Sequence, residues 1–225
     1  MDWSPSSPQR TSPTLPASLR PAAVPRNLLV GLTGGVAGTV LFLAIYTIEG
    51  ATRPGYNAWQ QTISALSLGP DGWIQRANFI LCGISVLWLA VVWRQILTGG
   101  VSARWYPIVH GLEGLGLLGV GIFTQDPLHT ACLIVIVSAM SVSLLVIARR
   151  FWSTPRWRGW AWFTVVCGLW PMVAMSFFGI ALNPHSGLSP YAGLIERLAT
   201  SPDIVWGAVI LFPLWARSKL MQPKA

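Results

Sequence analysis

Six long apolar runs dominate this chain. They lie near residues 28–49, 74–97, 105–124, 128–148, 159–182 and 203–217. An α-helix rises about 1.5 Å per residue, so roughly 20 apolar residues cross the hydrocarbon core of a bilayer. Only 10% of the residues are charged, which is too few to cover the surface of a soluble domain of this length. The runs therefore predict an all-α, polytopic membrane bundle of six transmembrane helices.

The first 27 residues differ in composition from the rest of the chain. They are rich in Pro and Ser and have no apolar periodicity, so they cannot bury enough apolar surface to offset the entropy of ordering. We expect residues 1–27 to be a disordered tail, residues 28–217 to form the membrane domain, and residues 218–225 to be a short C-terminal tail. The first apolar run starts late and has the length of a membrane span, which argues against a cleaved signal peptide.

Lys and Arg are distributed unequally between the two ends of the predicted bundle. Twelve fall at the end that holds both tails, and three fall at the other: Arg53, Arg76 and Arg197. By the positive-inside rule both termini are cytoplasmic, and we predict a multi-pass protein of a plasma membrane. The net charge of +8 is spread singly between apolar runs rather than gathered in a patch. The expected partners are therefore membrane lipids and not nucleic acid.

Two outer loops have amphipathic patterns. Asn57 can cap a short helix that ends at Gly69, with one apolar face made of Trp59, Ile63 and Leu66. Ser189 and Pro190 are start signals for a second helix, whose apolar positions at i, i+3, i+4 and i+7 are Tyr191, Leu194, Ile195 and Leu198. We expect short interfacial helices in the outer loops, which would form a roof over the bundle.

Four stretches carry a resemblance to a known family. They are Arg53-Pro54-Gly55-Tyr56, Thr62-Ile63-Ser64-Ala65-Leu66, Gly121-Ile122-Phe123-Thr124-Gln125-Asp126-Pro127 and Gly193-Leu194-Ile195-Glu196-Arg197-Leu198. In these segments the chain resembles the uncharacterised bacterial membrane family catalogued as domain of unknown function 998. The resemblance covers residues 28 to about 217 and implies a multi-helix integral membrane protein of a bacterial plasma membrane. Because that family has no established activity, the resemblance implies no catalytic role.

Glu113 is a candidate functional residue because it lies well inside a predicted span. His110 stands three residues earlier and shares its helix face. A bare carboxylate at this depth costs at least a few kcal/mol on insertion scales, so Glu113 must be neutral, paired or facing a polar cavity. A His110–Glu113 packing pair and a functional site are both open interpretations.

Asp126, His129 and His185 are candidate catalytic residues or metal ligands. All three fall at predicted outer loops or span ends, and carboxylate with imidazole suits Zn²⁺ or a similar ion. Asp126 before Pro127 is also the pattern of a helix N-cap followed by Pro at the first helical position. No cofactor is predicted outside this metal hypothesis.

Arg53, Tyr56, Glu196 and Arg197 are candidate ligand-binding residues of the outer loops. The two arginines can hold an anionic headgroup or carboxylate, or they can pair with acids and clamp the loops. In the first span, Gly31 and Gly35 form a G-x-x-x-G spacing that permits close helix approach. That face is a candidate for packing within the chain or for a homo-oligomer contact.

The sequence contains no G-x-S-x-G elbow, H-E-x-x-H motif or Walker-type phosphate loop. The leading functional hypothesis is non-catalytic binding of a lipid or small amphiphile under an extracytoplasmic roof. The first alternative is a membrane-embedded, metal-dependent lipid hydrolase or transferase that uses Asp126, His129 and His185 around a metal, with Glu113 or Glu196 as an assisting catalytic residue. The second is a proton-coupled transporter that uses Glu113. Whether the protein is an enzyme is left open by these patterns.

Overall fold

The computed structural model describes residues 25–124, 126–153 and 155–220, and within them it contains only helices, turns and loops. The six long helices are α1 (Arg26–Thr52), α2 (Gly72–Ile96), α3 (Gly100–Ile122), α4 (Pro127–Trp152), α5 (Arg158–Ala181) and α6 (Ala192–Leu220). Three short 3-10 helices lie between them: η2 (Ser64–Ser67), η3 (Pro155–Trp157) and η4 (Ser189–Tyr191). The predicted all-α fold is confirmed. Most of the two predicted tails lies outside the described residues.

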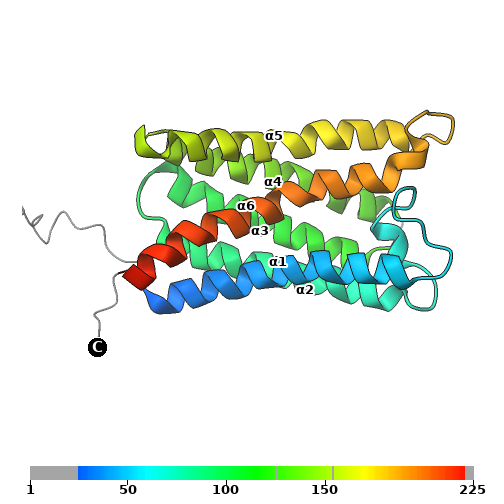
Figure 1. The fold of residues 1–225 in the computed structure, drawn as a ribbon, viewed down its shortest axis with the longest axis horizontal. Coiled ribbons are helices and arrows are strands. Elements are labelled where there is room, and N and C mark those ends of the chain that lie inside the picture. Colours follow the sequence, from blue (N-terminus) through cyan, green and yellow to red (C-terminus); the bar gives the residue numbers. More distant parts are fainter. Residues whose placement is uncertain (1–24, 125, 154, 221–225) are drawn as a thin grey trace, which may run out of the picture.

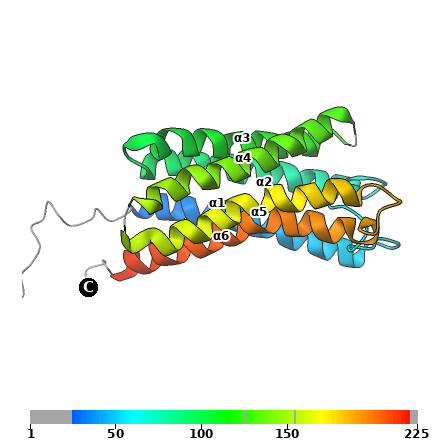
Figure 2. The ribbon, with the colours of Figure 1, turned by 90° about the horizontal axis from the view of Figure 1, so that it is seen from above.

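The six long helices run along one common axis (Figures 1 and 2). Each helix packs against the next in the chain, and α6 returns to contact α1, so the bundle closes. The loops after α1, α3 and α5 lie at one end, which we call the loop end. The opposite end holds the start of α1 and the end of α6, and we call it the basic end because several arginines gather there: Arg26, Arg94, Arg104, Arg149, Arg150 and Arg158.

Four helices, α1, α2, α4 and α5, are long and apolar enough to cross a membrane. Large apolar side chains on their outer faces are exposed, for example Trp162 and Val166 of α5. Exposed apolar faces of this extent are expected where lipid surrounds a bundle. The chain is therefore a multi-pass membrane protein. Helices α3 and α6 carry buried acids, and their crossing of the membrane remains an expectation.

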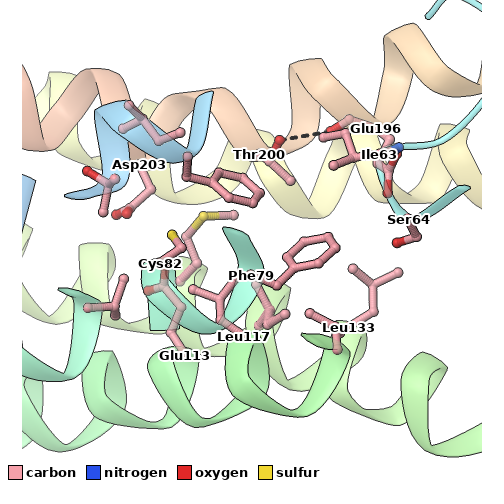
Figure 3. A pocket seen from close by; sticks show the side chains of 17 residues that line it. Ile63, Ser64, Phe79, Cys82, Glu113, Leu117, Leu133, Glu196, Thr200 and Asp203 are labelled. Atoms are coloured by element: carbon pink, nitrogen blue, oxygen red, sulfur yellow. Dashed lines mark hydrogen bonds between the residues drawn. The ribbon is translucent and has the colours of Figure 1, made fainter. Parts of the chain in front are cut away.

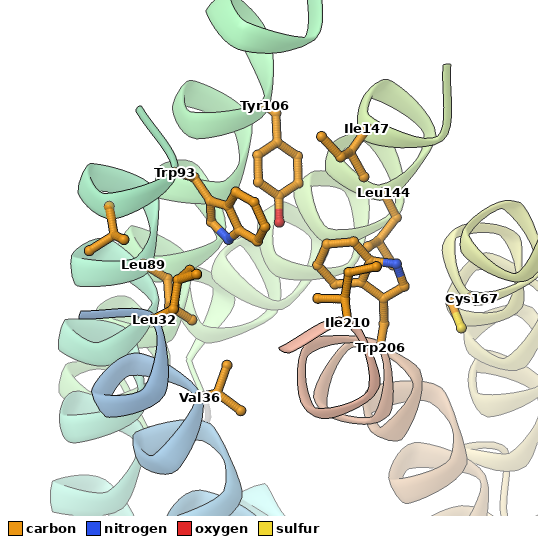
Figure 4. Close-up of a cluster of buried hydrophobic side chains, with 11 residues drawn as sticks. Leu32, Val36, Leu89, Trp93, Tyr106, Leu144, Ile147, Cys167, Trp206 and Ile210 are labelled. Carbon is orange, nitrogen blue, oxygen red and sulfur yellow. The ribbon is translucent and has the colours of Figure 1, made fainter. Parts of the chain in front are cut away.

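Buried aromatic side chains hold the basic end of the bundle together. Tyr106 of α3 is fully buried between Trp93 of α2 and Trp206 of α6, with ring centroids 5.6 Å and 6.2 Å away (Figure 4). The Trp206 Nε1–H donates to Thr164 Oγ1 of α5 at 2.9 Å. Since Trp206 contacts side chains of several helices, it fixes the position of α6 on the bundle axis.

The glycine face of α1 packs within the chain. A Cβ at Gly31 would lie 2.8 Å from Val92 of α2, and one at Gly35 would overlap Leu89. The Trp88 Nε1–H donates to Gly31 O at 3.0 Å across the same interface. Helix α2 therefore occupies the Gly31/Gly35 face, which is the intramolecular alternative of the two that the spacing predicts.

The first outer loop forms no amphipathic helix over residues 57–69, so that prediction is wrong. Asn57 Oδ1 accepts a hydrogen bond from Trp59 N at 3.0 Å, which makes a turn rather than a helix cap. Only η2 is helical in this segment. Ile63 and Leu66 are buried as expected, but Trp59 is 58% exposed because the turn directs it away from the bundle.

The second predicted interfacial helix is the first part of α6. The chain passes through η4 directly into α6, which begins 11 residues before the predicted span at 203. Its buried positions are Ala192, Gly193, Glu196 and Ala199. Gly193 lets this face of α6 pack closely against the first outer loop, since a Cβ there would collide with the carbonyl oxygens of Ala58 and Gln61.

Candidate functional site

A cavity of about 60 Å³ lies inside the loop-end half of the bundle. Helices α1, α2, α3, α4 and α6 contribute its walls, together with residues 63–64 of the first outer loop, which we call the roof segment. Its apolar lining is Phe42, Ile63, Phe79, Val86, Leu117, Val120, Leu133, Ile136, Met140 and Ile204. Its polar lining is Thr39, Ser64, Cys82, Glu113, Glu196, Thr200 and Asp203. This volume suits a few water molecules or one compact group.

Glu113 projects from the middle of α3 into this cavity and is 3% exposed (Figure 3). Its Oε2 lies 3.1 Å from His110 Nδ1, one helical turn earlier on the same face. The predicted His110–Glu113 pair is therefore confirmed. The ring of His110 also stacks on Tyr106, with centroids 5.4 Å apart, which fixes the imidazole beside the carboxyl group.

Asp203 is the residue that sequence reasoning misplaced. The last predicted apolar run begins at this residue, but in the structure it lies inside α6 and is only 9% exposed. It lines the cavity beside Glu113, at the end opposite the roof segment (Figure 3). It also lines a second cavity of about 20 Å³ that His110 and Tyr106 border.

The Asp203 carboxyl group makes no hydrogen bond to any of the described residues, although it interacts electrostatically with Glu113 and His110. A buried carboxyl group without a hydrogen-bond donor is costly, and buried polar groups normally have partners. A donor from water or from a ligand in the cavity would remove that cost.

Glu196 lies at the loop end of the same cavity, 3% exposed. Its Oε2 accepts a hydrogen bond from the backbone N–H of Ile63 in the roof segment. The spacing of Glu196, Thr200 and Asp203 at i, i+4 and i+7 places them on one face of α6. This spacing is the sequence pattern that could have predicted that Asp203 faces the same way as Glu196.

His129 ties the roof segment to α4. Its Nδ1–H donates to the carbonyl of Phe123 at 2.8 Å, which leaves Nε2 to accept the Ser64 hydroxyl hydrogen at 3.0 Å. Asp126 caps α4, since its Oδ1 accepts from the backbone N–H of His129 at 2.9 Å and Pro127 occupies the first turn. The capping role predicted for Asp126 is confirmed.

His185 lies apart from these residues. It is exposed, and its backbone N–H donates to Asn183 Oδ1 at 3.0 Å. In the part of the chain that the structure describes, no three His, Cys, Asp or Glu side chains are placed to hold a metal ion. Asp126, His129 and His185 are thus not brought together as a ligand set.

Arg53 and Arg197 hold the first outer loop in place. Arg53 donates to Glu49 at 2.8 Å and to the carbonyl of Leu66 at 2.7 Å. Arg197 donates to the carbonyls of Ala58 and Gln61 at 2.8 and 3.1 Å, and to the Tyr56 hydroxyl at 2.6 Å. These contacts match the clamping interpretation of the two arginines.

Comparison with known families decides the affiliation. The model of the family described as "Protein of unknown function (DUF998)" matches residues 36–212, which include all of the cavity lining. The chain belongs to this family. No curated protein and no solved structure matches it. The buried acids of this DUF998 protein therefore have to be interpreted from their own geometry.

Proposed function

We propose that this DUF998 protein binds a small amphiphile in the cavity beneath the roof segment. The observation that carries the proposal is the buried Asp203 carboxyl group, which faces the cavity and has no hydrogen-bond donor among the described residues. Sites for small molecules are commonly apolar cavities with a few convergent polar groups. Here Glu113, Glu196 and Asp203 are those groups, and Phe42 and Phe79 are part of the apolar wall.

The cavity volume narrows the ligand class. The volume of about 60 Å³ limits the part of a ligand that lies inside the bundle. It admits a compact polar group with the start of an apolar stem, which the rings of Phe42 and Phe79 can contact. A single-chain or small amphiphile fits this space with its polar group inside the cavity and its chain continuing beyond it.

The membrane placement belongs to the same proposal. All six long helices cross a bacterial plasma membrane, with the basic end in the cytoplasm by the positive-inside rule. The cavity then lies in the outer half of the bilayer, and the roof segment faces the extracytoplasmic side. Glu196 and His129 hold this segment over the cavity from α6 and α4.

Native mass spectrometry of the purified protein tests the proposal with two matched variants of α3. Leu117 lines the cavity, whereas Leu115 is exposed on the outer face of the same helix. The protein is expected to retain a small amphiphile, Leu117→Trp is expected to lose it, and Leu115→Trp is expected to keep it. Equal retention by both variants, or no retained molecule beyond bulk lipid, would contradict the proposal.

Proton-coupled transport is a second candidate, favoured by one observation. Asp203 lines both cavities, and the His110–Glu113 pair connects their linings. Ionisable groups in such a series are typical of proton relays within membranes. In proteoliposomes with a pH gradient, addition of a single-chain amphiphile is expected to dissipate the gradient with the wild type and not with Glu113→Gln. Equal dissipation by both proteins would exclude this candidate.

A further inference from the structure

The cavity holds more acidic than basic groups. Among the residues that the structure describes, its lining and that of the adjoining second cavity contain no Lys or Arg. The titratable groups that face Glu113 and Asp203 come from four helices: Cys82 of α2; Tyr106 and His110 of α3; Cys167 of α5; and Glu196 of α6. The α1 and α4 linings contribute no titratable group. Among these described lining residues, His110 is therefore the one base that can balance the acids Glu113 and Asp203.

The excess of acidic over basic groups limits how many carboxyl groups in the cavity can be charged at once. Two carboxylates that face one apolar cavity repel each other and lack solvation, so they cannot both be charged without a cation. A proton on the pair is one solution. A cationic group from a ligand is the other, and it also supplies the hydrogen-bond donors that Asp203 lacks. The rings of Phe42 and Phe79 line the same cavity, and aromatic faces attract cations.

We infer that the ligand of this cavity is an amine-bearing amphiphile whose ammonium group sits between Glu113 and Asp203. The inference rests on the proposed function and names the ligand class of that site. The ammonium N–H groups donate to the carboxylates, and the alkyl stem lies along the apolar wall. As the cation enters, the carboxyl pair releases one proton to water, so the charge of the cavity is unchanged by binding.

A comparison of three ligands with the same alkyl chain separates the two proposals: decylamine, decanol and decanoate. Isothermal titration calorimetry in nonionic detergent at neutral pH is expected to give decylamine an affinity at least tenfold above decanol, with decanoate weakest. Repeating the decylamine titration in buffers of different ionisation enthalpy is expected to reveal about one proton released per amine bound. Asp71→Asn is the control, since Asp71 is exposed before α2 and lies outside the lining of both cavities.

Glu113→Gln and Asp203→Asn are each expected to reduce decylamine affinity at least tenfold and to leave decanol affinity unchanged. Unchanged decanol binding also shows that these variants fold. Equal binding of decanol and decylamine, tighter binding of decanoate, or no proton release would overturn the amine inference and leave amphiphile binding intact. Failure of all three ligands to bind the wild type would overturn the proposed function itself.

Discussion

Replacement of Gly193 by Ala should destabilise the roof of the cavity. A Cβ at position 193 would lie 2.6 Å from the Ala58 carbonyl oxygen and closer still to that of Gln61. Ordinary contact begins near 3.4 Å, so the loop backbone must withdraw by about 1 Å. Overpacking of this kind costs about 1–3 kcal/mol.

The same movement lengthens hydrogen bonds between the loop and α6, each worth about 1 kcal/mol. They join Leu194 N to Trp59 O at 3.1 Å, and Arg197 to the carbonyls of Ala58 and Gln61. The summed loss is therefore on the order of 2–5 kcal/mol.

Thermal unfolding in detergent measures this loss, with Gly34→Ala as the matched control. Gly34 is exposed on α1, and a Cβ there would meet no atom within 4 Å. Ala is the better helix former by about 0.5–1 kcal/mol, so the control should unfold at the same or a slightly higher temperature. Gly193→Ala should lower the Tm by about 2–4 °C for each kcal/mol lost. Equal Tm values for the two variants would refute the packing of α6 against the loop.

Three further predictions concern the contacts around the roof segment. Glu196→Ala should speed hydrogen exchange of the Ile63 backbone amide, because the carboxyl oxygen that accepts its hydrogen bond is lost, whereas Glu196→Gln should keep most of the protection; equal exchange in the two variants would disprove this contact. Asp126→Ala should cost about 1 kcal/mol in unfolding experiments through loss of the α4 cap, and Asp126→Asn should retain most of it; equal losses would exclude capping. Arg53→Ala should speed hydrogen exchange of the backbone amides of residues 66–68, whereas Arg94→Ala at the basic end should not.

Hydropathy was sufficient to predict the helices whose outer surface is apolar. Five of the six predicted runs agree with helices that begin and end within a few residues of them. The exception is α6, where the prediction began at 203. Its first turns contain Glu196, Arg197 and Asp203, and a hydropathy window averages these side chains without regard to the direction in which they face.

The candidate site was predictable only in part. The i, i+3 spacing of His110 and Glu113 is a local property of one helix, so the pair could be anticipated. The approach of Glu113 to Asp203 depends on how α3 and α6 pack, and no local pattern records that packing. The sequence also could not show that Arg53 and Arg197 donate to backbone carbonyls of the first outer loop, because a pattern of side chains does not record where the backbone lies. For this reason the two arginines were compatible with a ligand-binding role.

Photo-crosslinking with a diazirine-bearing alkylamine is the most direct test of the central claim that the cavity binds an amphiphile. Helix α5 serves as an internal control, since it contributes nothing to the cavity lining but exposes Val166 and Val173 on its outer face. Peptide mapping should find labels on lining residues such as Phe79, Leu117 and Ile204, and excess unlabelled amine should remove them. Labels that fall on α5 with equal yield and resist competition would contradict the claim.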